Sequence, residues 1–260
     1  MLRTERLNTN KMRIEDLDTI RLDDFVSIIH ISNEIDKRRK QGKKRVVFFV
    51  ENSPAYPNTC VPLAAIIDYY KKIGITTDLI FLDDLVSYAS NLNIDNPYRV
   101  EDEHYAISLD YPFDIIWTFE TPKGQNVLVS AIVDALRRTG LCGDGIFSGL
   151  EWCLNETMDN VLTHSQSGKG FIMAQYHQTK KSFSFCVFDY GIGIYNSFIN
   201  STKYHPRTRV DAITLALQEK VTRDDKIGQG NGLWGLHQII EESAGSLKNH
   251  IRWRLLSDDF

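Results

Sequence analysis

The sequence predicts an α/β protein with two domains, each built from a sheet and the helices that cover it. In residues 45–82, two short apolar runs flank an amphipathic stretch, which is the strand–helix–strand order of a parallel layer. Residues 171–176 and 183–188 are apolar runs joined by a polar turn, which predicts an antiparallel pair. The chain has 260 residues, enough for two modest domains.

The composition is that of an ordinary globular protein, with 42% hydrophobic and 25% charged residues. The net charge of −4 gives no general attraction to nucleic acid or to an anionic membrane, so we expect neither as a partner. No signal peptide and no apolar run long enough to cross a bilayer is apparent. The four cysteines form no CxxC pair, which favours reduced thiols and a cytoplasmic location.

Residues 1–44 are predicted to hold a polar arm (1–20) and one helix (22–41). The helix ends in a basic run followed by Gly42. Cations at a helix C-terminus interact favourably with the helix dipole. We therefore interpret the basic run as a solvated helix end, with a patch for nucleic acid or an acidic partner as the alternative.

Residues 45–111 are predicted to form the first α/β domain. The expected elements are a strand at 45–51, a helix at 61–72 stopped by Gly74, a strand at 76–82, a short helix near 83–92 and a turn at 96–97.

Residues 112–260 are predicted to form the second domain, in which helices cover one face of a mixed sheet. The expected elements are a strand within 110–120, a helix at 126–138, a glycine-rich loop at 140–149, a helix through 150–164, the paired strands, a lid-like segment at 194–227 with a helix at 211–220, a helix at 233–242 and a strand at 247–256.

The first functional motif is Glu156-x-x-x-Asn160-x-x-x-His164. Its three polar residues recur every four positions, so they share one helix face. A carboxamide can bind Mg²⁺, and a carboxylate one turn away can orient or deprotonate a water or a hydroxyl. The alternative is an amphipathic helix with a polar outer face.

The second motif is Asp189-x-Gly191-x-Gly193, at the end of the apolar run 183–188. The glycines allow the backbone to turn tightly and to approach a ligand closely. An aspartate at a strand end can accept a hydrogen bond from an exocyclic amine such as that of adenine. The alternative is an ordinary turn.

The third motif places four glycines before a helical pattern. A glycine-rich turn that leads into a helix presents backbone N–H groups to an anion. No Gly-Lys-Ser/Thr follows, so it is not a Walker loop, and no compact βαβ unit makes it a Rossmann fingerprint. A flexible hinge is the alternative. These glycines are Gly228, Gly230, Gly232 and Gly235.

In this order, the three motifs resemble the GHKL ATPase family, which includes gyrase, heat-shock chaperones, histidine kinases and mismatch-repair ATPases. The resemblance covers residues 112–254, and the form of the first motif is most similar to the anti-sigma-factor serine kinases. It implies a Bergerat-type ATP site in a helix-on-mixed-sheet sandwich. Glu156 would be the general base, Asn160 the Mg²⁺ ligand and Asp189 the contact to the adenine amino group.

The same resemblance implies roles for the glycines and for the segments around them. Gly191 and Gly193 would shape the adenine pocket, and the glycines from 228 to 235 would border the phosphates at the end of a mobile lid. The family usually has a last strand with a threonine near adenine. The strand expected at 247–256 lacks it, and Ser257 is the nearest hydroxyl.

Residues 45–111 resemble the STAS-like domains of anti-anti-sigma factors. In those domains the turn before the helix carries a serine or threonine that a partner kinase phosphorylates. The corresponding stretch here, 56–62, lacks the usual Asp-Ser-Ser-Gly and contains Thr59 as its one hydroxyl residue of that type. We interpret Thr59 as a cap or turn residue.

These observations lead us to expect ATP binding with Mg²⁺-dependent γ-phosphoryl chemistry, either hydrolysis or transfer to a serine or threonine of a protein partner. The alternative is a regulatory ATP-binding module whose nucleotide state controls homodimerisation or partner binding without efficient turnover. A sensor histidine kinase fragment is a third reading, and the missing histidine-bearing hairpin argues against it.

Overall fold

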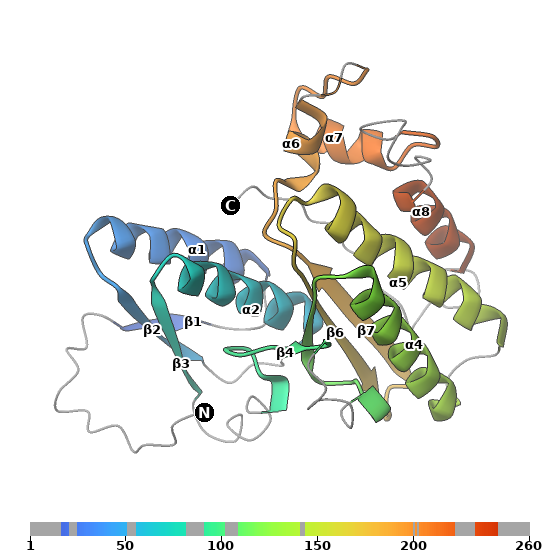
Figure 1. Cartoon of the computed structure of the whole chain (residues 1–260), viewed down its shortest axis with the longest axis horizontal. Coiled ribbons are helices and arrows are strands. Elements are labelled where there is room, and N and C mark those ends of the chain that lie inside the picture. Colours follow the sequence, from blue (N-terminus) through green and yellow to red (C-terminus); the bar gives the residue numbers. More distant parts are fainter. Residues whose placement is uncertain are drawn as a thin grey trace.

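Two sheets lie side by side in the protein, and helices flank both of them (Figure 1). The structure is a computed structural model, and it confirms the predicted mixed α/β class. It describes residues 17–20, 25–50, 56–81, 91–101, 109–140, 144–199, 201, 203–221 and 232–243.

The N-terminal sheet has three parallel strands in the order β1-β2-β3. Parallel neighbours need a crossover connection, and helices α1 and α2 provide the two crossovers. The strand–helix–strand order predicted for residues 45–82 is therefore confirmed. The bounds are β1 Leu17–Ile20, α1 Phe25–Lys40, β2 Arg45–Val50, α2 Pro57–Lys72 and β3 Thr76–Phe81.

The C-terminal sheet has four strands in the order β4-β5-β6-β7 and is mixed. β4 runs parallel to β5, whereas β5, β6 and β7 are antiparallel. The predicted pair of strands is confirmed, with Ile172 opposite Val187. The bounds are β4 Tyr98–Arg99, β5 Ile116–Phe119, β6 Gly170–His177 and β7 Ser182–Phe188.

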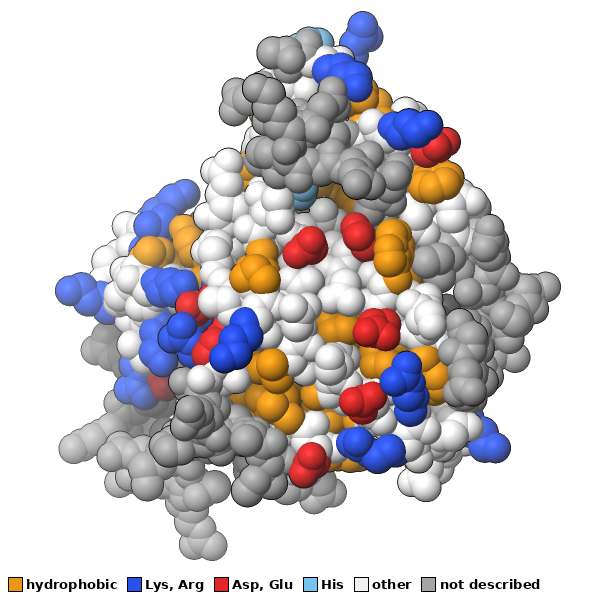
Figure 2. Space-filling model, turned by 45° about the vertical axis from the view of Figure 1, so that its right-hand side comes forward, with side chains coloured by type: hydrophobic (Ala, Val, Ile, Leu, Met, Phe, Trp, Pro, Cys, Tyr) orange, Lys and Arg blue, Asp and Glu red, His pale blue; other side chains and the backbone are white. Residues whose placement is uncertain are grey.

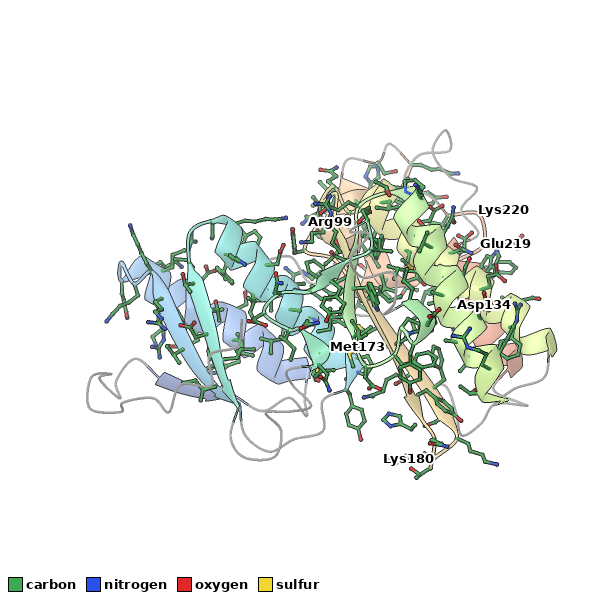
Figure 3. All side chains as sticks on the ribbon, turned by 60° about the horizontal axis from the view of Figure 1, so that its bottom comes forward. Arg99, Asp134, Met173, Lys180, Glu219 and Lys220 are labelled. Atoms are coloured by element: carbon green, nitrogen blue, oxygen red, sulfur yellow. The ribbon has the colours of Figure 1, made fainter. Side chains whose placement is uncertain are left out.

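Both faces of the C-terminal sheet are covered. The helices α4 (Pro122–Thr139) and α5 (Asp144–His164) pack against each other and share an apolar cluster with Trp117 and Ile172. The next side chains along β6 point to the opposite face. Phe171 and Met173 share a different cluster with the buried side of α2. Met173 is labelled in Figure 3.

Helix α2 belongs to the cores of both sheets. It contacts α1 and β3 on one side, and β5, β6 and β7 on the other. Its buried residues run through almost the whole helix, as expected of a helix that is covered all round. The apolar cluster around α2 therefore continues from the N-terminal sheet into the C-terminal sheet.

The helix predicted at 61–72 begins four residues earlier, at Pro57, so most of the stretch compared with the STAS turn is the first part of α2. Pro57 occupies the first helical positions, where a missing N–H costs little. Pro62 lies inside the helix. Thr59 is fully buried, and its hydroxyl donates to the carbonyl of Tyr56 at 3.0 Å, so it is a helix-start residue.

Three further expectations need correction. The polar arm predicted at 1–20 contains strand β1, which pairs with β2. The loop predicted at 140–149 is helical from Asp144 onward, after Gly140 ends α4 with a φ of 66°. β4 lies in the segment assigned to the first domain, yet it pairs with β5 of the C-terminal sheet. The division into 1–44, 45–111 and 112–260 stays a prediction.

The segment after β7 folds into two short helices, α6 (Gly193–Ile199) and α7 (Arg209–Ala216), which pack on each other. α7 starts with a capping box between Thr208 and Asp211 and is shorter than the predicted helix 211–220. The last described helix, α8 (Gly232–Ser243), packs on α5. The strand expected at 247–256 and Ser257 lie outside the described residues.

On the face shown in Figure 2, acidic and basic side chains of the described residues are interspersed over the C-terminal half. Basic side chains gather toward the N-terminal half, where the basic run ends α1. Lys37 and Arg38 lie near Glu34, and Arg39 forms an ion pair with Asp36. These pairs support the interpretation of a solvated helix end. Among the described helices, none is both long enough and apolar enough to cross a membrane.

Candidate nucleotide site

Glu156 lies on α5 and is half-buried. Burial raises the pKa of its carboxyl above the ordinary value of 4.5, and the nearby charge of Asp159 raises it further. Its side chain forms no hydrogen bond or ion pair with the residues that the structure describes. A half-buried carboxylate with a raised pKa and no partner among the described residues is suited to act as a general base.

Asn160 lies one turn further along the same face of α5. Its Nδ2 atom is buried and has no hydrogen-bond partner in the described part of the chain. Buried polar groups are nearly always paired in folded proteins, so this amide is a candidate for contact with a ligand. The oxygen and nitrogen of an amide exchange places by a flip, so the same side chain can present Oδ1 to a cation. His164, the third motif residue, ends α5.

Asp189 follows β7 directly and is half-buried. Its Oδ1 accepts a hydrogen bond from the backbone N–H of Gly191 at 2.7 Å, which closes a tight turn. Burial raises the pKa of Asp189, and this hydrogen bond offsets part of the rise. Among the described residues, no donor contacts the other carboxylate oxygen, so Oδ2 is left to accept from a ligand.

Gly191 brings the second motif onto the end of α5. A Cβ atom added at Gly191 would lie 2.0 Å from the carbonyl oxygen of Ser165, the residue after α5. The N–H of Ile192 donates to the same oxygen at 2.9 Å. Only glycine allows this approach. Gly193 has a left-handed φ of 70° and starts α6, so both glycines of the motif serve the local backbone.

Gly235 brings the third motif onto the same helix. A Cβ atom added there would lie 2.5 Å from Cη2 of Trp152 on α5. Trp152 precedes Glu156 by four residues and therefore shares its helix face. α8 begins at Gly232, so the end of the glycine motif lies beside this face. Gly228 and Gly230 lie outside the described residues.

All three motifs therefore meet at α5. Glu156 and Asn160 lie between two close contacts, one from α8 to Trp152 and one from the Asp189 loop to Ser165. Among the described residues, the arrangement combines a candidate base, an amide whose Nδ2 has no partner, and a half-buried carboxylate whose Oδ2 accepts no hydrogen bond. Such a set can position a nucleophile, a cation and an exocyclic amine.

An open hollow of about 470 Å³ lies beside the Asp189 loop. It shares Gly191 with the site but contains neither Glu156 nor Asn160, so we treat it as a neighbour of the site. It is lined by Ser165, Gln166, Ser167, Tyr190, Gly191, Ile192 and Asn196.

Sequence reasoning missed three residues that shape the site. Trp152 could have been identified from the helical spacing, because it lies four positions before Glu156 on the same helix face. Ser165 directly follows the first motif, but its contact with Gly191 depends on how the chain folds. Tyr190 lies inside the second motif, and its polar partners are in α2, more than a hundred positions away, where no local pattern indicates them.

Within the described ranges, no group of three or more His, Cys, Asp or Glu side chains is arranged to hold a metal ion. Mg²⁺ that arrives with a nucleotide needs one or two protein ligands, since phosphate oxygens and waters complete its shell. Asn160 fits that requirement.

A comparison of the chain with protein-family models, curated proteins and solved structures found no match. Its function is therefore inferred from the geometry of these residues.

Proposed function

We propose that this chain binds ATP between α5, the Asp189 loop and α8, and catalyses Mg²⁺-dependent γ-phosphoryl chemistry. The reaction is ATP hydrolysis or transfer to a serine or threonine of a protein partner. The observation that carries the proposal is the convergence on α5, where Gly191 and Gly235 hold two glycine-containing segments against the helix of Glu156 and Asn160.

The resemblance to GHKL ATPases supports the same reading. In the described residues the order is a motif helix, an antiparallel strand pair, a loop with Asp189, a connecting segment and a second helix. α4, α5 and the C-terminal sheet form a helix layer on a mixed sheet. This order agrees with the arrangement that the resemblance implies for residues 112–254.

Each side chain has a distinct role in the proposed reaction. Oδ2 of Asp189 accepts a hydrogen bond from the adenine amino group, while Oδ1 keeps the turn closed. Asn160 presents its amide oxygen to Mg²⁺, which supplies charge neutralisation to the phosphates when bound. Glu156 orients the attacking water or hydroxyl and accepts its proton. Positioning and electrostatic stabilisation provide most of the catalysis in phosphoryl transfer.

A second candidate function is a regulatory ATP-binding module with slow turnover. It is favoured by the contact between α2 and the C-terminal sheet, which joins the N-terminal half to the site. On this reading the STAS-like half passes the nucleotide state to a partner or to a second copy of the chain. Thr59 is fully buried, so the phosphoryl acceptor has to be sought elsewhere.

The test uses the full chain with γ-labelled ATP and Mg²⁺. Release of labelled phosphate that is lost in Glu156→Ala supports hydrolysis, and label retained on an added partner supports transfer. Glu156→Ala should still bind ATP, whereas Asp189→Asn should not. Asp134→Asn, which changes an exposed carboxylate on α4, is the matched control. Bound ATP that changes the oligomeric state with negligible turnover would favour the regulatory module.

The site assignment has a clear failure criterion. If wild type and Asp189→Asn bind ATP equally well, Asp189 does not contact the nucleotide. If the wild type binds no ATP at all, the proposed function is wrong.

A further inference from the structure

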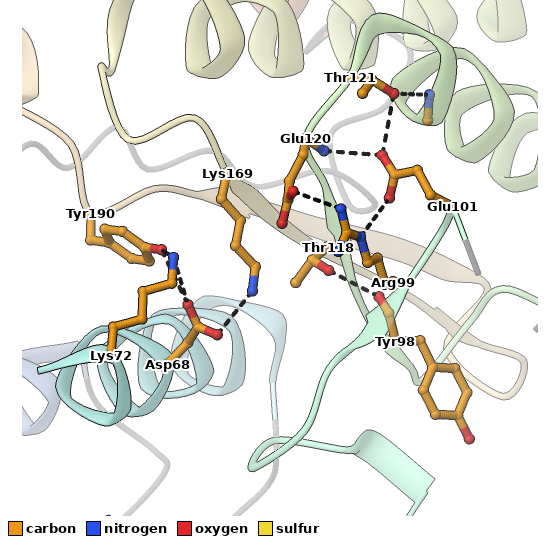
Figure 4. Close-up of polar contacts among 11 residues, drawn as sticks. Asp68, Lys72, Tyr98, Arg99, Glu101, Thr118, Glu120, Thr121, Lys169 and Tyr190 are labelled. Atoms are coloured by element: carbon orange, nitrogen blue, oxygen red, sulfur yellow. Dashed lines mark hydrogen bonds and ion pairs between the residues drawn. The ribbon is translucent and has the colours of Figure 1, made fainter. Parts of the chain in front are cut away.

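Four polar side chains join α2 to the loop of the second motif. This junction cluster consists of Asp68 and Lys72 from α2, Lys169 from the position just before β6 and Tyr190 from the loop (Figure 4). Tyr190 is the residue between Asp189 and Gly191, so the cluster directly adjoins the proposed adenine contact.

Asp68 is the centre of the junction cluster. Its Oδ1 accepts a hydrogen bond from Lys169 Nζ at 2.9 Å, and its Oδ2 accepts one from the hydroxyl of Tyr190 at 3.1 Å. Nζ of Lys72 lies 3.4 Å from the same Oδ2 and also donates to the Tyr190 hydroxyl. Tyr190 is therefore held as both a donor and an acceptor.

The ring of Tyr190 is held as firmly as its hydroxyl. It packs against Tyr69 of α2 and Phe171 of β6, with ring centroids 5.7 and 5.8 Å apart. Lys72 Nζ lies 4.9 Å from the centre of the Tyr190 ring. Aromatic and cationic contacts thus fix the ring from two different elements.

The ion pair between Asp68 and Lys169 is largely shielded from water, so it contributes to stability. The side chains of Asp68 and Lys169 are 19% and 16% exposed, so water screens their ion pair less than it screens a surface pair. Burial alone would raise the pKa of Asp68. The hydrogen bond and charge of Lys169, with help from Lys72 and Tyr190, hold it below its ordinary value. Asp68 is therefore ionised at neutral pH.

We propose that Asp68 and Tyr190 are positioning residues of the nucleotide site, through which α2 holds the Asp189 loop in its binding geometry. The two neighbours of Tyr190 are joined by the hydrogen bond that the Gly191 N–H donates to Oδ1 of Asp189. A shift of the Tyr190 ring therefore moves the carboxylate proposed to contact adenine. This inference rests on the proposed function and assigns the N-terminal half a part in ATP affinity.

The experiment compares ATP affinity in the wild type, Tyr190→Phe, Asp68→Asn and the double variant, with Mg²⁺ present. Tyr190→Phe removes one hydroxyl and keeps the ring. Each single variant should weaken ATP binding about three- to tenfold, as expected for the loss of a typical hydrogen bond. The double variant should be no weaker than the weaker single variant, because both remove the same interaction.

Asp78→Asn is the matched control. Asp78 forms an ion pair with Arg45 in the N-terminal sheet, away from the loop. This change should leave ATP affinity at the wild-type value. Equal ATP affinity in the wild type, Tyr190→Phe and Asp68→Asn would overturn the inference. Equal losses in Asp78→Asn and Asp68→Asn would also overturn it, since they would indicate a general loss of stability.

Hydrogen exchange without nucleotide separates this inference from the proposed function. Asp68→Asn should speed exchange of the Gly191 and Ile192 amides, and Asp78→Asn should not. If the wild type binds no ATP, the proposed function fails, and exchange alone decides whether Asp68 positions the loop. Unchanged exchange at these amides in Asp68→Asn would show that it does not.

Discussion

Gly235 of α8 packs directly on Trp152 of α5, close enough that a Cβ atom would lie 2.5 Å from Cη2 of the indole. Trp152 precedes Glu156 by one helical turn. The contact therefore sets how near the start of α8 can approach the candidate base. The last glycine of the third motif acts here through its small size.

Gly235→Ala should destabilise the protein despite the better helix propensity of alanine. The propensity gain is about 1 kcal/mol, and overpacking against the large, half-buried Trp152 ring costs about 1–3 kcal/mol. We expect a lower urea midpoint and weaker ATP binding. The double variant Gly235→Ala/Trp152→Leu should recover part of both losses. A more stable Gly235→Ala variant with unchanged ATP affinity would contradict the contact.

Gly191→Ala should affect the site more severely. The added methyl group would meet the backbone carbonyl of Ser165, which has no rotamer by which to move away. We expect ATP binding to be lost, with a stability cost of about 1–3 kcal/mol in urea unfolding. Gly193→Asn is the comparison, because asparagine tolerates the left-handed φ of 70° found there. If the two variants bind ATP equally, the Ser165 contact does not order the loop.

Asp189→Asn should stabilise the protein without nucleotide while it removes ATP binding. Burial raises the pKa of Asp189 above 3.8, so the folded protein binds its proton more tightly than the unfolded chain does. The stability cost of the carboxylate therefore appears as pH rises above 3.8 and is complete above the raised folded pKa. Asparagine keeps the acceptor for Gly191 and avoids that cost.

Thermal unfolding at two pH values tests this prediction. Asp189→Asn should have the higher Tm at about pH 7, and the difference should vanish when wild-type Asp189 is protonated at low pH. A lower Tm than the wild type at neutral pH would mean that the ionised carboxylate stabilises the fold in the absence of ligand.

Glu156→Gln should retain ATP binding within about twofold and lose about 10²–10⁴-fold in turnover, the usual contribution of a general base. The base acts in its ionised form, and the pKa of Glu156 is raised above 4.5. Wild-type turnover should therefore fall as pH decreases through that raised value. A pH–rate profile checks this, and an acid limb that persists in the residual rate of Glu156→Gln would assign the limb to another group.

Elements with strong local patterns could be predicted from the sequence. The β2–α2–β3 order and the β6–β7 pair follow from runs of apolar residues. The failures share a physical cause, since tertiary contacts outweighed local signals. Pro57 indicated a loop, but it is buried at the start of α2, which packs between the two sheets. β1 has its partner in β2, beyond α1, so its own residues gave little sign of pairing.

The candidate site likewise contains residues that the sequence could predict and contacts that it could not. Helical spacing was enough to place Glu156 and Asn160 on one face. Spacing could not show that Gly191 packs against Ser165, or that the Tyr190 hydroxyl donates a hydrogen bond to Asp68. These contacts depend on how distant segments come together. The polar partners of a loop residue are set by tertiary structure, and a single sequence gives no local signal for them.

Because α2 forms part of the hydrophobic core of both sheets, neither half of this protein can be exchanged independently of the other. A chain divided at 111/112 would leave Phe171 and Met173 on one piece, and the matching side of α2 on the other, open to water. Each fragment would expose an apolar surface that is complementary only to the other fragment. Exchange of the N-terminal half with that of another protein would succeed only if the new half brought an α2 shaped for this C-terminal sheet.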